Sequence, residues 1–93
     1  MLIDFDPDKN DRNVKERGLP FELVLEIDWE TALIGPDQRR DYGEDRIIAL
    51  GKIEGRLYHV TYVWRGNTMR IISFRKANNR EISFYEKTRP LHD

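Results

Sequence analysis

The arginines of the predicted strands are the residues of this sequence best suited to chemistry. Arg46, Arg70 and Arg75 fall in segments whose alternating pattern predicts β-strands, which are rigid supports for a site. A guanidinium group carries a fixed positive charge, and its planar fork of donors matches a phosphate group. Cleavage of RNA by its own 2′-hydroxyl needs such a charge on the phosphorane, together with groups that take and deliver protons. We therefore predict these arginines as candidate catalytic residues.

Four further side chains are candidates for proton transfer or for positioning a substrate: Glu81, Lys9, Lys15 and Tyr85. Glu81 also has a structural interpretation. It stands three residues after Asn78, and this spacing predicts a capping box at the start of a helix. Because the cap uses the same carboxylate, the structural role of Glu81 competes with a catalytic one.

Histidine, metal and thiol chemistry have little support. His59 is the only histidine within a predicted strand and is expected in the core, while His92 lies near the C-terminal end. The alternating aspartates of residues 4–8 suggest an EF-hand loop, but Lys9 stands at its glycine position and Lys15 at its glutamate position. The chain has no cysteine. We predict no metal and no cofactor.

The composition indicates one small domain, residues 1–93, without a basic surplus. Sixteen lysines and arginines face 17 aspartates and glutamates, for a formal net charge of −1. A nucleic-acid-binding protein is usually basic, so any attraction to RNA must come from local clusters. No segment has the pattern of a signal peptide or the length of an apolar membrane span. We expect a cytoplasmic protein.

The N-terminal half predicts two helices and a short strand. Asp6 is a suitable cap, the helix runs to Arg17, and Gly18 suits a left-handed end. Residues 21–27 fit either a helical face or a strand, and we favour a short second helix. Residues 32–34 then form a short strand, expected at a sheet edge.

The C-terminal half predicts an antiparallel meander followed by a helix. Its strands are residues 46–51, 57–65 and 68–76, joined by turns at Glu54-Gly55 and Gly66-Asn67. A last helix covers about 79–87. The expected fold is α+β: two N-terminal helices, an antiparallel three- to four-stranded sheet and a C-terminal helix.

Two-residue hairpin turns also predict which side chains share a face. Counting outward from the turns places Arg46 and Arg70 on either side of Val63. The same count places Arg75 on the opposite face, next to Tyr58. A β-bulge would change this assignment, because a one-residue shift moves every later side chain to the other face.

Three groups of residues resemble the BrnT family of toxins over roughly residues 4–86. The first is Asp41-Tyr42-Gly43-Glu44-Asp45-Arg46-Ile47-Ile48-Ala49-Leu50-Gly51. The second is Arg70-Ile71-Ile72-Ser73-Phe74-Arg75-Lys76-Ala77, followed by Arg80-Glu81 and Tyr85. The third is N-terminal: Phe5-Asp6, Lys9, Asn13, Lys15, Gly18 and Phe21. Their order and spacing are more specific than any one of them.

The resemblance implies a fold similar to RelE-type toxins and a ribonuclease that blocks translation by cleaving RNA without a metal. It also implies a ribbon-helix-helix antitoxin, which neutralises the chain and binds their operator DNA in complex with it. Positions shared with the family give the catalytic candidates Arg46, Arg70, Arg75 and Glu81. The RNA-binding candidates are Lys9, Lys15, Arg17 and Tyr85.

Some positions depart from the family pattern. Arg17 stands where many relatives have histidine, so a proton-carrying imidazole is lost. Phe74 stands where many have alanine and is expected to add bulk beside the strand arginines. An alternative is therefore a catalytically decayed toxin that acts only as an antitoxin-binding co-repressor. A stand-alone RNA-binding domain is a third hypothesis, and it predicts salt-sensitive binding without cleavage.

Overall fold

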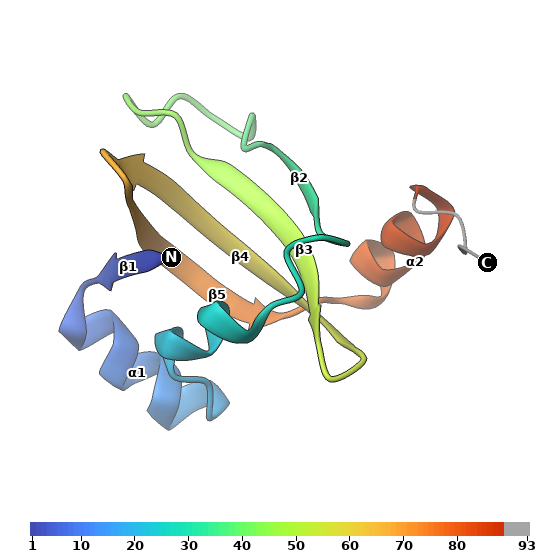
Figure 1. Ribbon diagram of the computed structural model, residues 1–93, viewed down its shortest axis with the longest axis horizontal. Helices are drawn as coiled ribbons and strands as arrows, with labels where there is room; N and C mark the ends of the chain where they lie inside the picture. The colour runs from blue at the N-terminus through green and yellow to red at the C-terminus, as the bar shows by residue number, and fades with distance from the viewer. Residues whose placement is uncertain (89–93) are drawn as a thin grey trace.

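The fold is organised around one five-stranded sheet, shown in Figure 1, in a computed structural model that describes residues 1–88. His92 lies outside the described residues. The strand order is β1-β5-β4-β3-β2. The strands are β1 (Leu2–Phe5), β2 (Leu33–Pro36), β3 (Ile47–Ile53), β4 (Arg56–Arg65) and β5 (Thr68–Lys76). β1 runs parallel to β5, and the other neighbouring pairs are antiparallel.

The prediction of an antiparallel three- to four-stranded sheet is wrong in one respect, because it omits β1. This strand has four residues and no hairpin turn to mark it. It pairs with a strand more than 60 residues later in the chain, with Leu2 opposite Thr68. Local patterns report turns and periodicity, so a short parallel strand of this kind leaves no signal in them.

The helices follow their capping residues. In α1 (Pro7–Arg17), the Asp6 side chain accepts a hydrogen bond from the Asp8 backbone at 2.9 Å, and Gly18 ends the helix at φ 68°. In α2 (Asn79–Thr88), Asn78 and Glu81 form the predicted capping box. The predicted second N-terminal helix is instead a 3₁₀ helix, η1 (Phe21–Glu26). No helix of residues 1–88 combines the length and apolar character needed to span a membrane.

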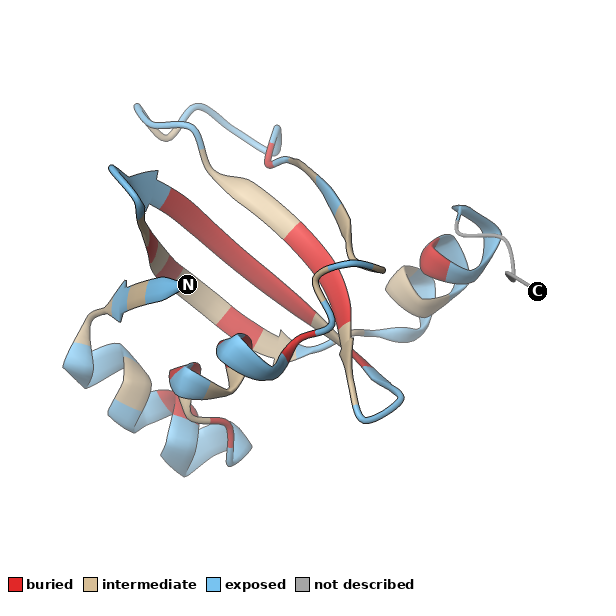
Figure 2. Ribbon diagram, in the orientation of Figure 1, coloured by how far each residue is buried: buried red, intermediate tan, exposed pale blue. Residues whose placement is uncertain are grey.

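Each face of the sheet carries its own core. On the side that we call the η1 face, Phe21 and Val24 of η1 pack with Ala49, Val60 and Ile71 of the strands. On the other side, which we call the α2 face, Tyr85 of α2 packs with Leu50 and Leu57. Figure 2 shows the buried residues running along β4, at the centre of the sheet.

A β-bulge in β5 changes the predicted arrangement of side chains. Val63 pairs with Arg70, as the turn geometry predicts. The register then shifts, so that Tyr62 pairs with Ile71 and Thr61 with Ser73, and Ile72 has no partner on β4. The prediction that Arg75 lies beside Tyr58 on the opposite face is therefore wrong. Arg75 pairs with His59, on the α2 face.

Candidate active site

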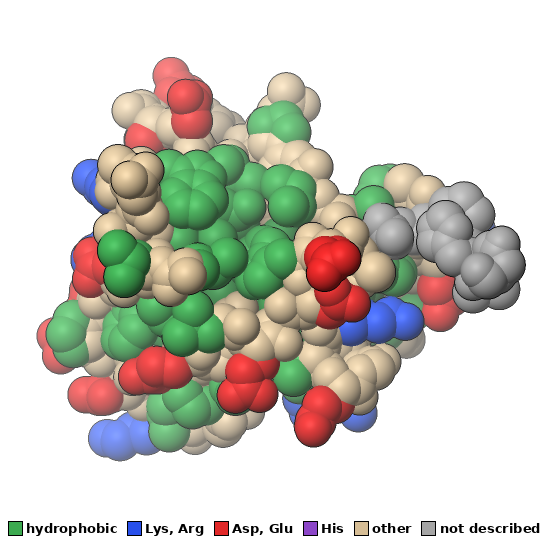
Figure 3. All heavy atoms as spheres, viewed as in Figure 1, with side chains coloured by type: hydrophobic (Ala, Val, Ile, Leu, Met, Phe, Trp, Pro, Cys, Tyr) green, Lys and Arg blue, Asp and Glu red, His purple; other side chains and the backbone are tan. Residues whose placement is uncertain are grey.

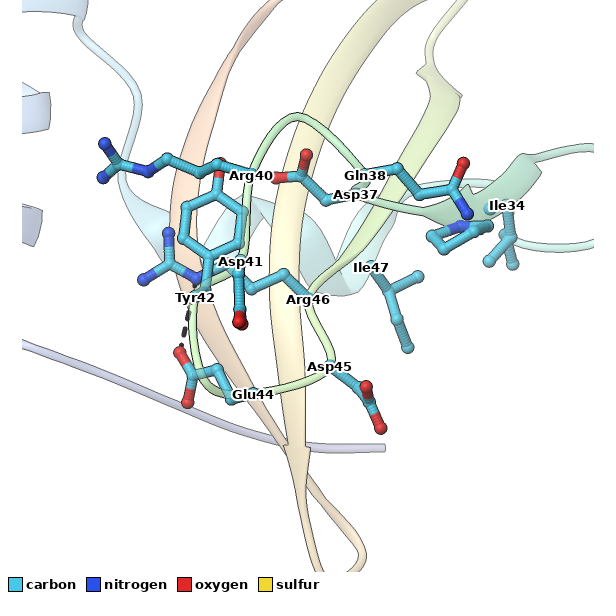
Figure 4. A pocket seen from close by; sticks show the side chains of 12 residues that line it. Ile34, Asp37, Gln38, Arg40, Asp41, Tyr42, Glu44, Asp45, Arg46 and Ile47 are labelled. Atoms are coloured by element: carbon cyan, nitrogen blue, oxygen red, sulfur yellow. Dashed lines mark hydrogen bonds and ion pairs between the residues drawn. The ribbon is translucent and has the colours of Figure 1, made fainter.

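The bulge places Arg75 on the face that carries the other two candidate arginines. Arg70 and Arg75 lie on the α2 face of β5, opposite Val63 and His59. Arg46 directly precedes β3, and strand alternation from Ile47 assigns it to the same face. Figure 4 shows the Arg46 and Ile47 side chains pointing in opposite directions. The predicted pairing of Val63 with Arg70 is thus present, with Arg46 assigned to the same face and Arg75 farther along β5.

Arg75 and Glu81 form a two-point ion pair on this face. The two Arg75 amino nitrogens donate to the two Glu81 carboxylate oxygens, at 2.9 and 2.8 Å. The Asn78 backbone N–H donates to the same carboxylate at 2.9 Å. The Arg75 hydrogen bonds are the main reason why the pKa of Glu81 falls to about 2. Glu81 therefore serves as capping residue and as the anion that orients Arg75.

His59 joins this pair, which the sequence prediction did not anticipate. It is buried, as expected of a core residue, but its Nε2 lies 3.8 Å from Glu81 Oε2. Burial lowers the pKa of His59, and the positive charge of Arg75 lowers it further. His59 Nδ1 and Thr61 Oγ1 are buried without a hydrogen-bond partner among the described residues. The position of Arg75 beside His59 depends on the bulge, so counting residue pairs outward from the hairpin turns does not predict this cluster.

Arg70 has a partner from the unpredicted strand. Its Nη1 donates to Asp4 Oδ2 at 2.6 Å, across the parallel pairing of β1 with β5. The hydrogen bond from Arg70 is the main cause that lowers the pKa of Asp4. About a third of the Arg70 side chain and about half of the Asp4 side chain are exposed (33% and 53%). Arg70 therefore keeps a solvent-facing surface for a ligand.

Arg46 lies in a surface pocket of about 620 Å³ formed by the loop between β2 and β3 (Figure 4). Its guanidinium lies 4.1 Å from the centre of the Tyr42 ring, and its Nε donates to Glu44 at 3.3 Å. Glu44 also accepts a hydrogen bond from Arg65 at 3.4 Å. Arg46 is thus held by stacking and by an ion pair, and its two amino nitrogens make no hydrogen bond within the described residues.

A second ion pair fixes this loop at its start. Arg39 donates from two nitrogens to the buried Asp37 carboxylate, at 2.8 and 2.7 Å. These hydrogen bonds hold the pKa of Asp37 well below its ordinary value. The positive charge of Arg39 also reaches His59, whose pKa it helps to lower. Asp37 and Arg39 are not among the predicted site residues, and the sequence offers one signal for them, an aspartate with an arginine two residues later.

Comparison with known families identifies the chain. The family described as the ribonuclease toxin BrnT of a type II toxin–antitoxin system matches residues 5–81. The chain belongs to the BrnT family. Among individual curated proteins, none matches it significantly. BrnT toxins are ribonucleases that act with an antitoxin partner, so an RNA-cutting site and a protein-binding surface are both expected here.

The BrnT match includes the basic residues of α1. Lys9 and Arg17 line a pocket of about 220 Å³ together with Ile72 and Ser73 of the bulge. Arg17 donates to Asn13 at 2.6 Å, and Asn13 donates to the Phe74 carbonyl at 3.0 Å. Through this contact, α1 is fixed along the edge of β5 beyond the end of β1. Lys15 is exposed and does not line this pocket.

Tyr85 and Phe74 have surroundings that differ from those predicted from the sequence. Tyr85 lies outside the BrnT match and is buried, and its hydroxyl donates to the Thr31 carbonyl at 3.0 Å. In this arrangement it holds α2 on the sheet. Phe74 does not add bulk beside the arginines. It is fully buried in the η1-face core, where its ring stacks on Tyr58 at 5.3 Å.

Proposed function

We propose that the α2 face is the RNA-cleaving surface of this BrnT toxin. In this proposal Arg46, Arg70 and Arg75 contact phosphate groups, and Glu81 positions Arg75. The observation that carries the proposal is the bulge at Ile72, because it brings Arg75 to the face that carries Arg70. Each of these side chains is partly exposed, at 25%, 33% and 31%, so each is open to a ligand from solvent.

The proposed reaction is attack of the RNA 2′-oxygen on the adjacent phosphorus. The P–O bond to the 5′-oxygen breaks, one proton leaves the 2′-hydroxyl, and one proton is delivered to the 5′-oxygen. The products are a 2′,3′-cyclic phosphate and a 5′-hydroxyl. Negative charge on the phosphorane is opposed by guanidinium donors that are already oriented, which is the usual source of large rate effects in such sites. We propose that arginine charge serves here without a metal.

Arg75 is suited to this role because its ion pair leaves donors available. A guanidinium has five N–H donors; the hydrogen bonds of Arg75 to Glu81 use two of them and its hydrogen bond to the Lys76 carbonyl, at 3.2 Å, uses a third, which leaves two. With a pKa of about 2, Glu81 stays ionised at neutral pH and keeps the fork in one orientation. A guanidinium held in this way loses little conformational freedom when it binds a phosphate.

We further propose that Lys9, Lys15 and Arg17 bind the RNA backbone on the α1 side of the site. The pocket of Lys9 and Arg17 reaches Ser73, and Ser73 lies two residues from Arg75. Tyr85 contacts RNA in this proposal only where α2 moves, because its ring is buried against the sheet.

The cellular setting that we propose is cytoplasmic. There, RNA cleavage blocks translation, and a ribbon-helix-helix antitoxin neutralises the toxin and carries it to operator DNA.

The test is to induce the chain alone in a bacterial host and to map new RNA ends within minutes. Wild type should arrest growth and produce ends with 5′-hydroxyls, and the purified protein should cut RNA equally with and without EDTA. Arg46→Ala, Arg70→Ala and Arg75→Ala should each reduce cleavage. Arg56→Ala is the matched control, since Arg56 is an exposed strand arginine with no ion pair among the described residues.

Full cleavage by both the Arg70 and Arg75 variants would overturn this site assignment. A different outcome is a folded wild-type chain that binds its antitoxin and cuts no RNA. That result would favour the decayed toxin acting as co-repressor. One observation favours this alternative: Arg46, Arg70 and Arg75 are each paired with a carboxylate, which offsets their charge.

A further inference from the structure

The η1 face has an apolar area that no helix of residues 1–88 covers. We call it the aromatic patch and define it by Ile3, Trp29, Ile47, Tyr62 and Trp64. Tyr62 is buried at its centre, and the rings of Trp29 and Trp64 meet it edge-on, each at 5.9 Å between ring centres. Trp64 is 49% exposed, and Ile3, Trp29 and Ile47 are partly exposed at the margin of the core. Figure 3 shows hydrophobic side chains gathered on this side of the molecule.

Acidic residues surround the patch. Glu44 and Asp45 line a pocket of about 420 Å³ together with Ile47, Val63 and Trp64, and Glu44 is also paired with Arg46 of the α2 face at 3.3 Å. Asp28 and Glu30 flank Trp29 in the chain, and both are exposed. Arg65 also lines the pocket, but it is paired with Glu44 at 3.4 Å. Figure 3 shows Asp and Glu side chains around the hydrophobic area, with few Lys or Arg side chains on this side.

The two faces of the sheet therefore differ in character. The α2 face presents arginines, whereas the η1 face presents aromatic rings within an acidic margin. RNA phosphates are repelled by such a margin. Contiguous exposed apolar patches with polar rims mark protein-binding surfaces, and tryptophan is enriched among the residues that dominate binding energy.

We propose that the aromatic patch is the docking surface for the antitoxin of this chain. The fitting partner is an antitoxin segment that presents apolar side chains flanked by lysine or arginine, because these charges complement the acidic margin. A second copy of this chain fits less well, because a two-fold contact would bring the same acidic residues against one another. The inference rests on the membership of the family, which implies an antitoxin, and is independent of the proposed catalytic arginines.

The test uses the full chain co-purified with the antitoxin from the adjoining reading frame. The dissociation constant is compared for wild type, Trp64→Ser and Phe84→Ser. Phe84 is the matched control, since it is a similarly exposed aromatic (56%) on α2. We expect Trp64→Ser to weaken binding by about 30-fold or more. Phe84→Ser and Arg75→Ala should bind as wild type does.

Charge reversal provides a second measurement. Asp45→Lys changes an exposed loop residue, so the fold is expected to persist. It should weaken antitoxin binding several-fold at low salt, with a smaller effect at high salt. Thermal melts of each free variant show whether it is folded. If Trp64→Ser fails to fold, Asp45→Lys decides the question.

Three results would overturn the proposal. The first is wild-type affinity in both Trp64→Ser and Asp45→Lys. The second is a loss of affinity in Phe84→Ser or Arg75→Ala alone, which would place the antitoxin on the α2 face. The third is a free chain that dimerises through Trp64, with antitoxin binding unaffected by the substitution. None of these outcomes depends on whether the chain cleaves RNA, so failure here is distinct from failure of the proposed ribonuclease site.

Discussion

Arg75 lies directly opposite His59 across β4 and β5, and its guanidinium is held by Glu81 at the start of α2. One extra residue in β5, Ile72, produces this pairing. The bulge thus has two effects: it moves Arg75 to the face that carries Arg70, and it brings a buried imidazole close to the ion pair of Arg75 with Glu81. β-bulges recur where a strand must redirect a side chain, often next to active sites.

The first prediction concerns the geometry of Arg75. Arg75→Ala should lower the rate of RNA cleavage by about 100-fold or more, the usual effect of removing one preorganised donor. Arg75→Lys should restore little of this loss, because an ammonium cannot form the two-point contact with Glu81. Single-turnover cleavage of a defined RNA measures both. Recovery of more than half the wild-type rate by lysine would show that charge alone matters at this position.

The second prediction concerns Asp4, which offsets the charge of Arg70. Asp4→Asn should tighten RNA binding by about threefold to fivefold, because one nearby negative charge is removed at the protein surface. The slope of log affinity against log salt should steepen by up to about 0.7. Glu22→Gln, an exposed carboxylate on η1, is the control. Equal affinities of the Asp4 and Glu22 variants would mean that Arg70 does not meet the RNA.

Much of the fold follows from local sequence rules. The cap at Asp6, the end at Gly18 and the capping box of Asn78 and Glu81 are each confirmed where predicted. The strand β5 has its predicted bounds, Thr68–Lys76. These features depend on residues within a few positions of one another. By contrast, β1 depends on pairing with β5, and η1 is a 3₁₀ helix that buries Phe21 and Val24 against the sheet.

The site was less predictable than the helices and strands, because it too depends on pairing between residues that are far apart in the chain. Arg70 pairs with Val63 as expected, and Ile47, next to Arg46, pairs with Tyr62, because short hairpin turns fix both registers. Arg75 lies beyond the bulge, and the sequence has no turn residue in the middle of β5 that would predict a bulge there. His59 was expected in the core and is buried there, but its neighbours changed with the register. A single extra residue in a strand thus decides which side chains share a face of the sheet.

The third prediction concerns acid stability. The pKa of Glu81 falls from 4.5 to about 2, so its ion pair stabilises the fold fully above about pH 4.5. This contribution is lost as pH falls from about 4.5 through about 2. With allowance for partial exposure, it amounts to about 2 kcal/mol. Chemical denaturation at pH 7 and pH 3 should show a smaller loss of stability in Glu81→Gln than in wild type. Equal losses would show that Glu81 is not paired in solution.

The fourth prediction separates the structural role of Tyr85 from a role in RNA binding. Tyr85→Phe removes only the hydroxyl that donates to the Thr31 carbonyl, and the ring can still pack with Leu50 and Leu57. The expected cost is about 1 kcal/mol, or about 4–8 °C in melting temperature for a domain of this size. Because the hydroxyl is used within the fold, the KM for RNA should match wild type at temperatures where both proteins are folded. A raised KM without a change in melting temperature would instead mean that the hydroxyl meets the RNA, and that α2 leaves the sheet when substrate binds.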